Sequence, residues 1–166
     1  MPIEVKLSDL IEALDSAMDE QTSYLDKRSG EIVLVTDDDI TAAENEELRL
    51  KSPDWQQESI AAAREVLDDS ENLLPLPDKF EINEYRIMEE FCLALENRQA
   101  GSELHRLIKG SGAFRRFRNA IRERNIEQDW YDFKRRALEE IAIQWLEENG
   151  ISYKRDDVID ASEATA

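Results

Sequence analysis

Apolar residues recur at spacings of three, four and seven positions over most of this chain, which is the pattern of amphipathic helices. Ser8 and Ser52 precede two such segments as predicted N-caps, and Pro53 takes a first helical position. Asn83 is the predicted cap of another helix, and Gly110 ends the next one. The helices predicted in this way cover residues 8–14, a short stretch after 36–39, 52–67, 83–95, 102–109, 112–124 and 127–149.

Two short segments near the N-terminus have the composition of β-strands. Tyr24-Leu25 and residues 31–35 flank a polar loop, in which Gly30 can adopt the positive φ angle of a hairpin. Because the second strand is apolar at successive positions, we expect helices to cover it. Residues 73–77 contain two prolines and cannot form a helix interior, so we predict an extended strap held to the core by its leucines.

Large apolar side chains at helical spacing predict the core of the helical part. Trp55 is interpreted in the same way, as a packing residue of the helix over 52–67. The buried positions expected from the last two helices are Phe114, Phe117, Ile121, Trp130, Phe133, Ala137, Ile141 and Trp145.

These elements predict a mainly helical α+β protein, in which a short N-terminal β-hairpin packs on a multi-helix body. A chain of 166 residues has the length of one domain, and we assign residues 1–155 to a single globular domain. Residues 156–166 are small and acidic, which predicts a disordered tail.

Charge is distributed unevenly along the chain, whose formal net charge is −18. Residues 1–99 carry 26 Asp and Glu against nine Lys and Arg, whereas residues 106–136 carry ten basic residues against four acidic ones. Such an acidic chain repels nucleic acid at long range, so general DNA or RNA binding is disfavoured. Its acidic half is expected to attract a basic partner protein or the basic segment of the same chain.

Composition also bears on the cellular compartment. The longest aliphatic run, Ile32 to Val35, is far too short to span a membrane, and the N-terminus has no signal-like apolar core. The single cysteine, Cys92, cannot form an internal disulfide and suits a reducing environment. We therefore expect a cytoplasmic protein that does not bind membranes.

The stretch from Gly110 to Arg118 combines a glycine turn with several arginines at a predicted helix start. One hypothesis is an anion site, in which the backbone N–H groups of Ser111 and Gly112 and the side chains of Arg115 and Arg116 hold a phosphate or carboxylate. The simpler alternative is structural: the glycines form a tight corner between helices and the arginines pair with the acidic half of the chain. The motif lacks the Lys-Ser/Thr ending of a Walker-type loop.

Arg115, Arg118 and Arg122 follow i, i+3 and i+7 spacing, so they share a helix face away from the predicted core. We take Arg118 and Arg122, together with Tyr131, as a candidate interaction surface.

No catalytic, metal or cofactor site is predicted. Asp37 to Asp39 lack the ligand spacing and central glycine of a calcium loop and are interpreted as helix-capping acids. His105 is the only histidine, which excludes a multi-histidine metal site within one chain. Cys92 lies on the apolar face of its helix, where a buried and inert thiol is expected.

Several of these stretches together resemble one known family. They are Tyr24-Leu25-Asp26, Ser29-Gly30-Glu31 with Val33, Leu74 to Pro77, Glu84 to Glu89, Gly110 to Phe117 and Trp130-Tyr131. In this combination the chain is similar to the bacterial uncharacterised protein family 0158 from about Leu7 to Ile151. The resemblance implies a bacterial cytosolic protein of unestablished activity, and it supplies no catalytic residue.

Three functions from different classes are consistent with the sequence. The first is a non-catalytic interaction or regulatory protein, which the absence of any recognisable nucleophile–base pair favours. The second is an anion-binding protein or phosphate-ester enzyme that uses the Gly110 to Arg118 stretch. The third is an RNA contact through Arg106, Lys109, Arg115, Arg118 and Arg122, which the net charge opposes.

Overall fold

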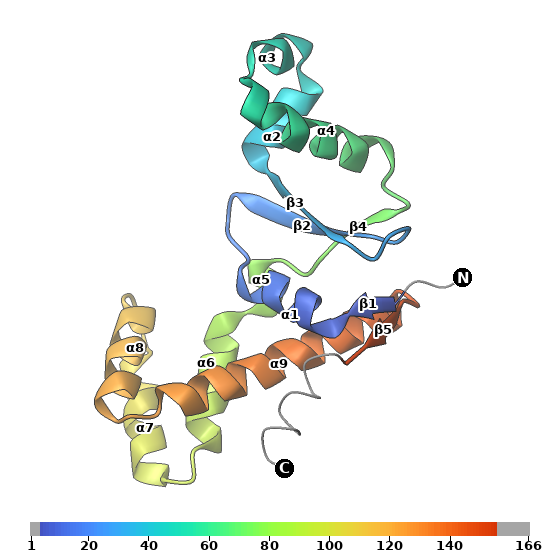
Figure 1. Cartoon of the computed structure of the whole chain (residues 1–166). Helices are drawn as coiled ribbons and strands as arrows, with labels where there is room; N and C mark the ends of the chain where they lie inside the picture. Colours follow the sequence, from blue (N-terminus) through green and yellow to red (C-terminus); the bar gives the residue numbers. More distant parts are fainter. Residues whose placement is uncertain (1–3, 156–166) are drawn as a thin grey trace. The chain divides into compact units, whose positions relative to one another are not determined.

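The computed structural model describes residues 4–155, and these form a mainly helical α+β structure, as predicted (Figure 1). The chain divides into two compact units, which we describe separately. The first comprises residues 1–82 and 141–166, and the second residues 83–140. The single domain over 1–155 stays a prediction, and the predicted tail at 156–166 lies outside the described residues.

The first unit contains a three-stranded antiparallel sheet in the order β3-β2-β4. The predicted hairpin is confirmed as β2 (Gln21–Asp26) and β3 (Ile32–Thr36), with Tyr24 opposite Val33 and Gly30 at a φ angle of 78°. The predicted strap forms β4 (Leu73–Pro75) on the other edge of β2, where Leu74 lies opposite Leu25. The hairpin is therefore not left as an isolated two-stranded ribbon, which is marginally stable in water.

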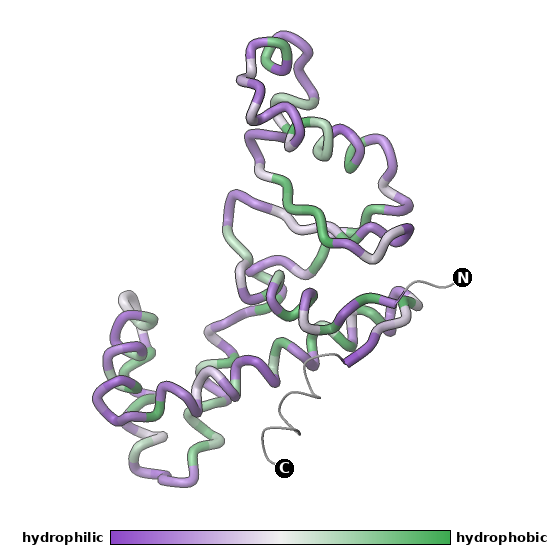
Figure 2. The backbone as a smooth tube through the Cα atoms, in the orientation of Figure 1, coloured by the Kyte–Doolittle hydropathy of each residue, from purple (hydrophilic) through white to green (hydrophobic). Residues whose placement is uncertain are grey.

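Two helices of the first unit pack on β3, which is the apolar strand visible in Figure 2. Their contact residues with the sheet form one buried cluster. These residues are Val35 and Leu73 of the sheet, Ala42 and Ala43 of α2 (Asp37–Glu44), and Ile60, Ala63 and Val66 of α4 (Asp54–Asp68). Leu34 points away and is 55% exposed, so the helices do not cover both faces of β3 as expected.

The acidic run at 37–39 caps α2, as predicted. The backbone N–H of Asp39 donates to Thr36 Oγ1 at 3.1 Å, and the N–H of Thr36 donates back to Asp39 Oδ2 at 3.3 Å. This reciprocal pair is a capping box. Gln56 of α4 donates to the other carboxylate oxygen of Asp39 at 3.3 Å, so this buried side chain also joins two helices.

Two predicted N-caps are wrong, one by two residues and the other by one. Helix α1 (Leu7–Asp15) begins before Ser8 and has Lys6 at its cap position. Helix α4 has Pro53 rather than Ser52 at its cap, because the Ser52 hydroxyl donates to Leu48 O at 2.7 Å and closes α3 (Glu46–Lys51) instead.

The hairpin loop is fixed to the C-terminal end of α4 by Arg28. Its guanidinium pairs with Asp26 at 3.0 Å, with Asp69 at 3.4 Å and with Glu65. The hydrogen bond from Arg28 holds the pKa of Asp26 below its ordinary value. Arg28 thus neutralises part of the excess negative charge of the N-terminal half, to which it also belongs.

A second, two-stranded sheet in the first unit was not predicted from the sequence. β1 (Glu4–Lys6) pairs in parallel with β5 (Ser152–Lys154), so residues almost 150 positions apart lie side by side. Val5 is 1% exposed. Both strands have three residues, which is too short for an alternating pattern to be recognised.

The second unit consists of α6 (Glu84–Ala94), α7 (Arg98–Leu107), α8 (Ala113–Glu123) and the first part of α9 (Glu127–Glu148). Asn83 caps α6, as predicted, by accepting the N–H of Arg86 at 3.2 Å. The core is an aromatic cluster in edge-to-face contact. Its ring centroids lie 6.0 Å apart for Phe91–Phe117, 5.4 Å for Phe91–Trp130, 5.4 Å for Phe91–Phe133 and 4.8 Å for Phe117–Trp130.

Two of the predicted core aromatics are in fact exposed. Trp55 is 80% exposed, because it lies five residues before Ile60 and so about 140° away around α4 from that buried position. Phe114 is 42% exposed, because Ala113, four residues before Phe117, takes the buried position. Along α9 the buried row also falls one position later than predicted. Its members are Leu138, Ala142 and Leu146, while Ala137, Ile141 and Trp145 are half-buried.

Helix α7 begins at Arg98, four residues earlier than predicted, and places Gly101 against α6. A Cβ atom at Gly101 would lie 2.4 Å from the backbone oxygen of Cys92, so only glycine fits without a backbone shift.

We predict that Gly101→Ala destabilises the protein by about 1–3 kcal/mol, because the added methyl group forces α6 and α7 apart. The free energy of unfolding from urea titration measures this effect. Alanine normally stabilises a helix interior relative to glycine, so the expected sign is opposite to that of intrinsic helix propensity. Ser102→Ala, at an exposed neighbouring position, is the control and is expected to change stability by less than about 0.5 kcal/mol. Equal stability of the two variants would contradict the close approach.

Candidate functional site

The glycine turn before α8 has the backbone conformation that the sequence suggested. Gly110 and Gly112 have φ angles of 82° and 79°, in the left-handed region. Arg116 folds back over this turn. Its guanidinium donates to the carbonyl oxygens of Leu107 and Ser111 at 2.6 Å each and of Lys109 at 2.7 Å. It therefore closes the C-terminal end of α7 and fixes the corner between the two helices.

The predicted anion site is only partly assembled. Arg116 lies at Ser111 and Gly112, but its donors already have three protein carbonyls as acceptors. Arg115 is exposed, and no hydrogen bond or ion pair engages it within the described part of the chain. The anion site stays a prediction, and the observed contacts of Arg116 belong to its structural alternative.

The predicted interaction residues are all on the surface. Arg118 and Arg122 are exposed along α8 in line with Arg115, and in the described residues 83–140 none of the three has a hydrogen-bond or ion-pair partner. Tyr131 is 54% exposed on α9. We call Arg115, Arg118 and Arg122, with the exposed Phe114, the basic face of α8.

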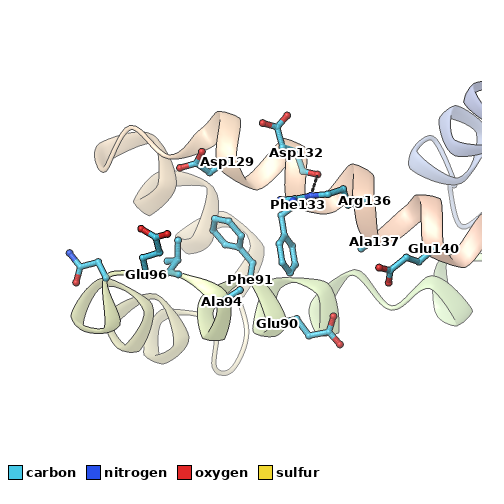
Figure 3. A pocket seen from close by; sticks show the side chains of 12 residues that line it. Glu90, Phe91, Ala94, Glu96, Asp129, Asp132, Phe133, Arg136, Ala137 and Glu140 are labelled. Carbon is cyan, nitrogen blue, oxygen red and sulfur yellow. Dashed lines mark hydrogen bonds between the residues drawn. The ribbon is translucent and has the colours of Figure 1, made fainter. Parts of the chain in front are cut away.

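A groove that the sequence did not predict lies in the second unit, along α6 and α9. It has a volume of about 790 Å³. Phe91 of α6 and Phe133 of α9 point toward each other between the two helices and form its floor with alanines (Figure 3). The lining residues are Glu90, Phe91, Ala94, Leu95, Glu96, Asn97, Asp129, Asp132, Phe133, Arg136, Ala137 and Glu140.

The rim of this groove is strongly acidic. Its five carboxylates belong to Glu90, Glu96, Asp129, Asp132 and Glu140, and Arg136 is the one basic lining residue. Arg136 does not neutralise the rim by a side-chain ion pair among the described residues. Its Nε donates instead to the backbone oxygen of Asp132 at 3.4 Å, the bond drawn in Figure 3. Five carboxylates beside an apolar floor produce a negative potential that favours a cationic, partly apolar ligand.

Two of the rim acids have neutral or basic neighbours on their own helices. Gln128 donates to Asp132 at 2.9 Å, and Arg86 donates to Glu90 at 3.2 Å. These exposed contacts follow i, i+4 spacing and have little energetic weight. The side chains of Glu96, Asp129 and Glu140 make no hydrogen bond or ion pair with another described residue.

The signal for the groove was present in the sequence but not recognisable there. Asp129, Asp132 and Glu140 follow helical spacing around Phe133 and Ala137 on α9. Acidic residues are so frequent in this chain that such a row does not stand out, and the facing residues come from α6, some forty positions earlier.

Other candidate groups do not form a reactive site. Cys92 is buried, and desolvation raises the pKa of its thiol to about 11, so the thiol stays protonated at neutral pH. His105 is half-buried, with Nε2 3.8 Å from Glu89 Oε2. Among residues 4–155, no three His, Cys, Asp or Glu side chains gather in a metal-binding arrangement. Within the same residues, no helix is both long and apolar enough to cross a bilayer.

Comparison with known proteins places the chain in a family. The sequence pattern described as "Uncharacterised protein family (UPF0158)" matches residues 1–165. The chain belongs to this family. It is 24% identical over 151 residues to a UPF0158 protein of Pseudomonas aeruginosa, a match that covers 90% of this chain and 86% of that protein. No solved structure matches the chain significantly.

We predict that Arg116→Met destabilises the protein by about 1–2 kcal/mol, since the carbonyl oxygens of Leu107, Lys109 and Ser111 lose a charged donor at once. Arg115→Met, one position earlier and exposed, is expected to change stability by less than about 0.5 kcal/mol. Urea titration of both variants beside the wild type measures the difference. If the two substitutions cost the same, the contacts of Arg116 do not hold the corner between α7 and α8.

Proposed function

We propose that this UPF0158 protein is a non-catalytic interaction module, with a regulatory role exerted through binding, and that the acidic groove is its recognition site. The ligand proposed for the groove is a basic segment of a partner protein. The observation that carries this proposal is the set of five carboxylates that line the groove together with Phe91 and Phe133.

The composition of the groove favours a peptide segment over a small metabolite. Its floor is apolar where the last part of α6 faces α9, and its charged lining groups are five carboxylates and one arginine. A basic amphipathic segment satisfies both features: its apolar side chains cover the phenylalanines while its lysines and arginines meet the rim. The formal net charge of −18 attracts such a segment at long range and raises its association rate.

The residues of the rim and the floor contribute differently to binding. Burial of apolar side chains on Phe133 and Ala137 supplies the larger part of the affinity, because exposed ion pairs are worth little individually. The carboxylates select the sign of the ligand's charge and exclude acidic segments. Binding is therefore expected to weaken with added salt without disappearing.

We predict that reversing two rim charges weakens binding of a basic peptide at least tenfold, which corresponds to about 1.4 kcal/mol. The variant is Asp132→Lys/Glu140→Lys. The probe is a short fluorescein-labelled peptide with Leu and Phe at helical spacing and Lys or Arg elsewhere, and its fluorescence anisotropy is measured against protein concentration.

The matched control is Glu147→Lys/Glu148→Lys. It changes the net charge by the same amount at exposed positions of α9 outside the groove lining. We expect this control to bind within threefold of the wild type. Equal weakening in both variants would show that only net charge matters, and tight binding of the same peptide with Glu in place of Lys and Arg would exclude charge selection. Either result contradicts the proposed site.

A further inference from the structure

The basic face of α8 has the chemistry that the groove selects. It presents three arginines and an exposed aromatic side chain on a single helix. Arg115, Arg118 and Arg122 are exposed, without a bonding partner in the described residues of their unit, and Phe114 is 42% exposed beside them. Stacked like charges destabilise a helix unless an opposite charge faces them, so this face is incomplete on its own.

The dimensions of helix and groove also correspond. α8 contains 11 residues and is therefore about 16 Å long. The acidic row of the groove runs along α9 from Asp129 to Glu140, which is about the same length. The spacing of Asp129 and Asp132 along one helix equals that of Arg115 and Arg118 along the other.

The basic face cannot reach the groove of its own chain. Helix α8 is fixed in the second unit by Phe117, whose ring contacts those of Phe91 and Trp130 at 6.0 and 4.8 Å. Arg116 fixes the start of the same helix to the turn before it. Because these contacts occupy the inner face, the arginines remain outward from the second unit and cannot enter the groove of their own chain.

We propose that two copies of this protein associate head to tail, with the basic face of α8 of one copy in the acidic groove of the other. This inference rests on the proposed function, because it takes the groove to be a site for basic amphipathic helices. Each dimer formed in this way keeps one free groove and one free basic face, so further copies can add.

Net charge determines how this association depends on salt. Residues 83–140 carry 12 Lys and Arg against 11 Asp and Glu, so the excess negative charge lies elsewhere in the chain. At about 10 mM salt the Debye length is ~30 Å and the copies repel as whole molecules. Near 150 mM it falls to ~8 Å, so the local contacts dominate, and near 1 M they are screened as well. Association is therefore strongest at intermediate salt, whereas a purely apolar contact strengthens steadily with salt.

Sedimentation velocity of the full chain at protein concentrations up to ~1 mM tests the proposal. The wild type is expected to show a weight-average sedimentation coefficient that rises with concentration at 150 mM salt and rises less at 10 mM and at 1 M. Two variants, Arg115→Glu/Arg118→Glu in the basic face and Asp132→Lys/Glu140→Lys in the groove, are each expected to stay monomeric. Glutamate near the start of α8 favours the helix, so the first variant is expected to fold.

Mixing the two variants gives the sharpest result. The basic-face variant retains an intact groove and the groove variant retains an intact α8, so an equimolar mixture can form one complete contact. We expect a heterodimer that does not grow further. The mixture also serves as the control for folding, because a misfolded variant could not contribute its intact surface. It controls for net charge as well, because both altered net charges are present in a mixture that still associates.

Four outcomes would overturn the inference. A wild type that stays monomeric at every salt concentration, while its groove still binds the basic peptide, excludes self-association and leaves the proposed function intact. A wild type that associates while the mixed variants do not would place the contact on other surfaces. Association that increases continuously up to 1 M salt would make the contact apolar. Loss of both peptide binding and self-association would remove the proposed function as well.

Discussion

The edge-to-face packing of Phe91 with Phe117, Trp130 and Phe133 determines the arrangement of the second unit. One ring thereby joins α6 to both α8 and α9. The contact with Phe117 holds α8 in a single orientation, in which its arginines face outward. Beside this contact, the half-buried Phe133 and the edge of the buried Phe91 line the floor of the groove between α6 and α9 (Figure 3). The same cluster thus stabilises the second unit and positions both the acidic groove and the basic face of α8.

Charge in the second unit is separated in space rather than neutralised. Its 12 basic and 11 acidic residues nearly cancel, but the rim of the groove is negative and the exposed face of α8 is positive. Arg116 shows how one member of the basic stretch is removed from this surface, since its guanidinium is used to close α7. The neighbouring Arg115 has no such contact within the described residues and remains available. Adjacent arginines of one motif therefore have different roles.

Several local signals in the sequence predicted local structure correctly, although the predicted caps at Ser8 and Ser52 were wrong. The hairpin around Gly30, the capping box at Thr36 and the cap at Asn83 each depend on a few consecutive residues whose backbone preferences are known. Trp55 and Phe114 were assigned to the core from residue type, yet their positions around α4 and α8 place them outside it. The position of a residue around the helix axis, relative to neighbours that are buried, therefore predicts its burial better than the size of its side chain does.

The remaining features depend on contacts between distant segments. The pairing of β1 with β5 and the close approach at Gly101 leave no pattern in either segment alone. The groove also combines α6 with α9, and in so acidic a chain the carboxylate row that lines it does not stand out from the others. The candidate anion site was predicted because a basic stretch is rare in this acidic chain. Its central arginine, Arg116, donates to carbonyl oxygens of the protein itself.

The most direct measurement of the groove's role is a titration of isotope-labelled protein with the basic peptide, followed by amide chemical shifts in NMR spectra. Binding in the groove predicts that the largest changes occur at residues 90–97 and 129–140, while the amides of the basic face of α8 change little. Changes concentrated on the acidic first unit, or spread evenly over both units, would show that the peptide responds to overall charge and would contradict a recognition site between α6 and α9.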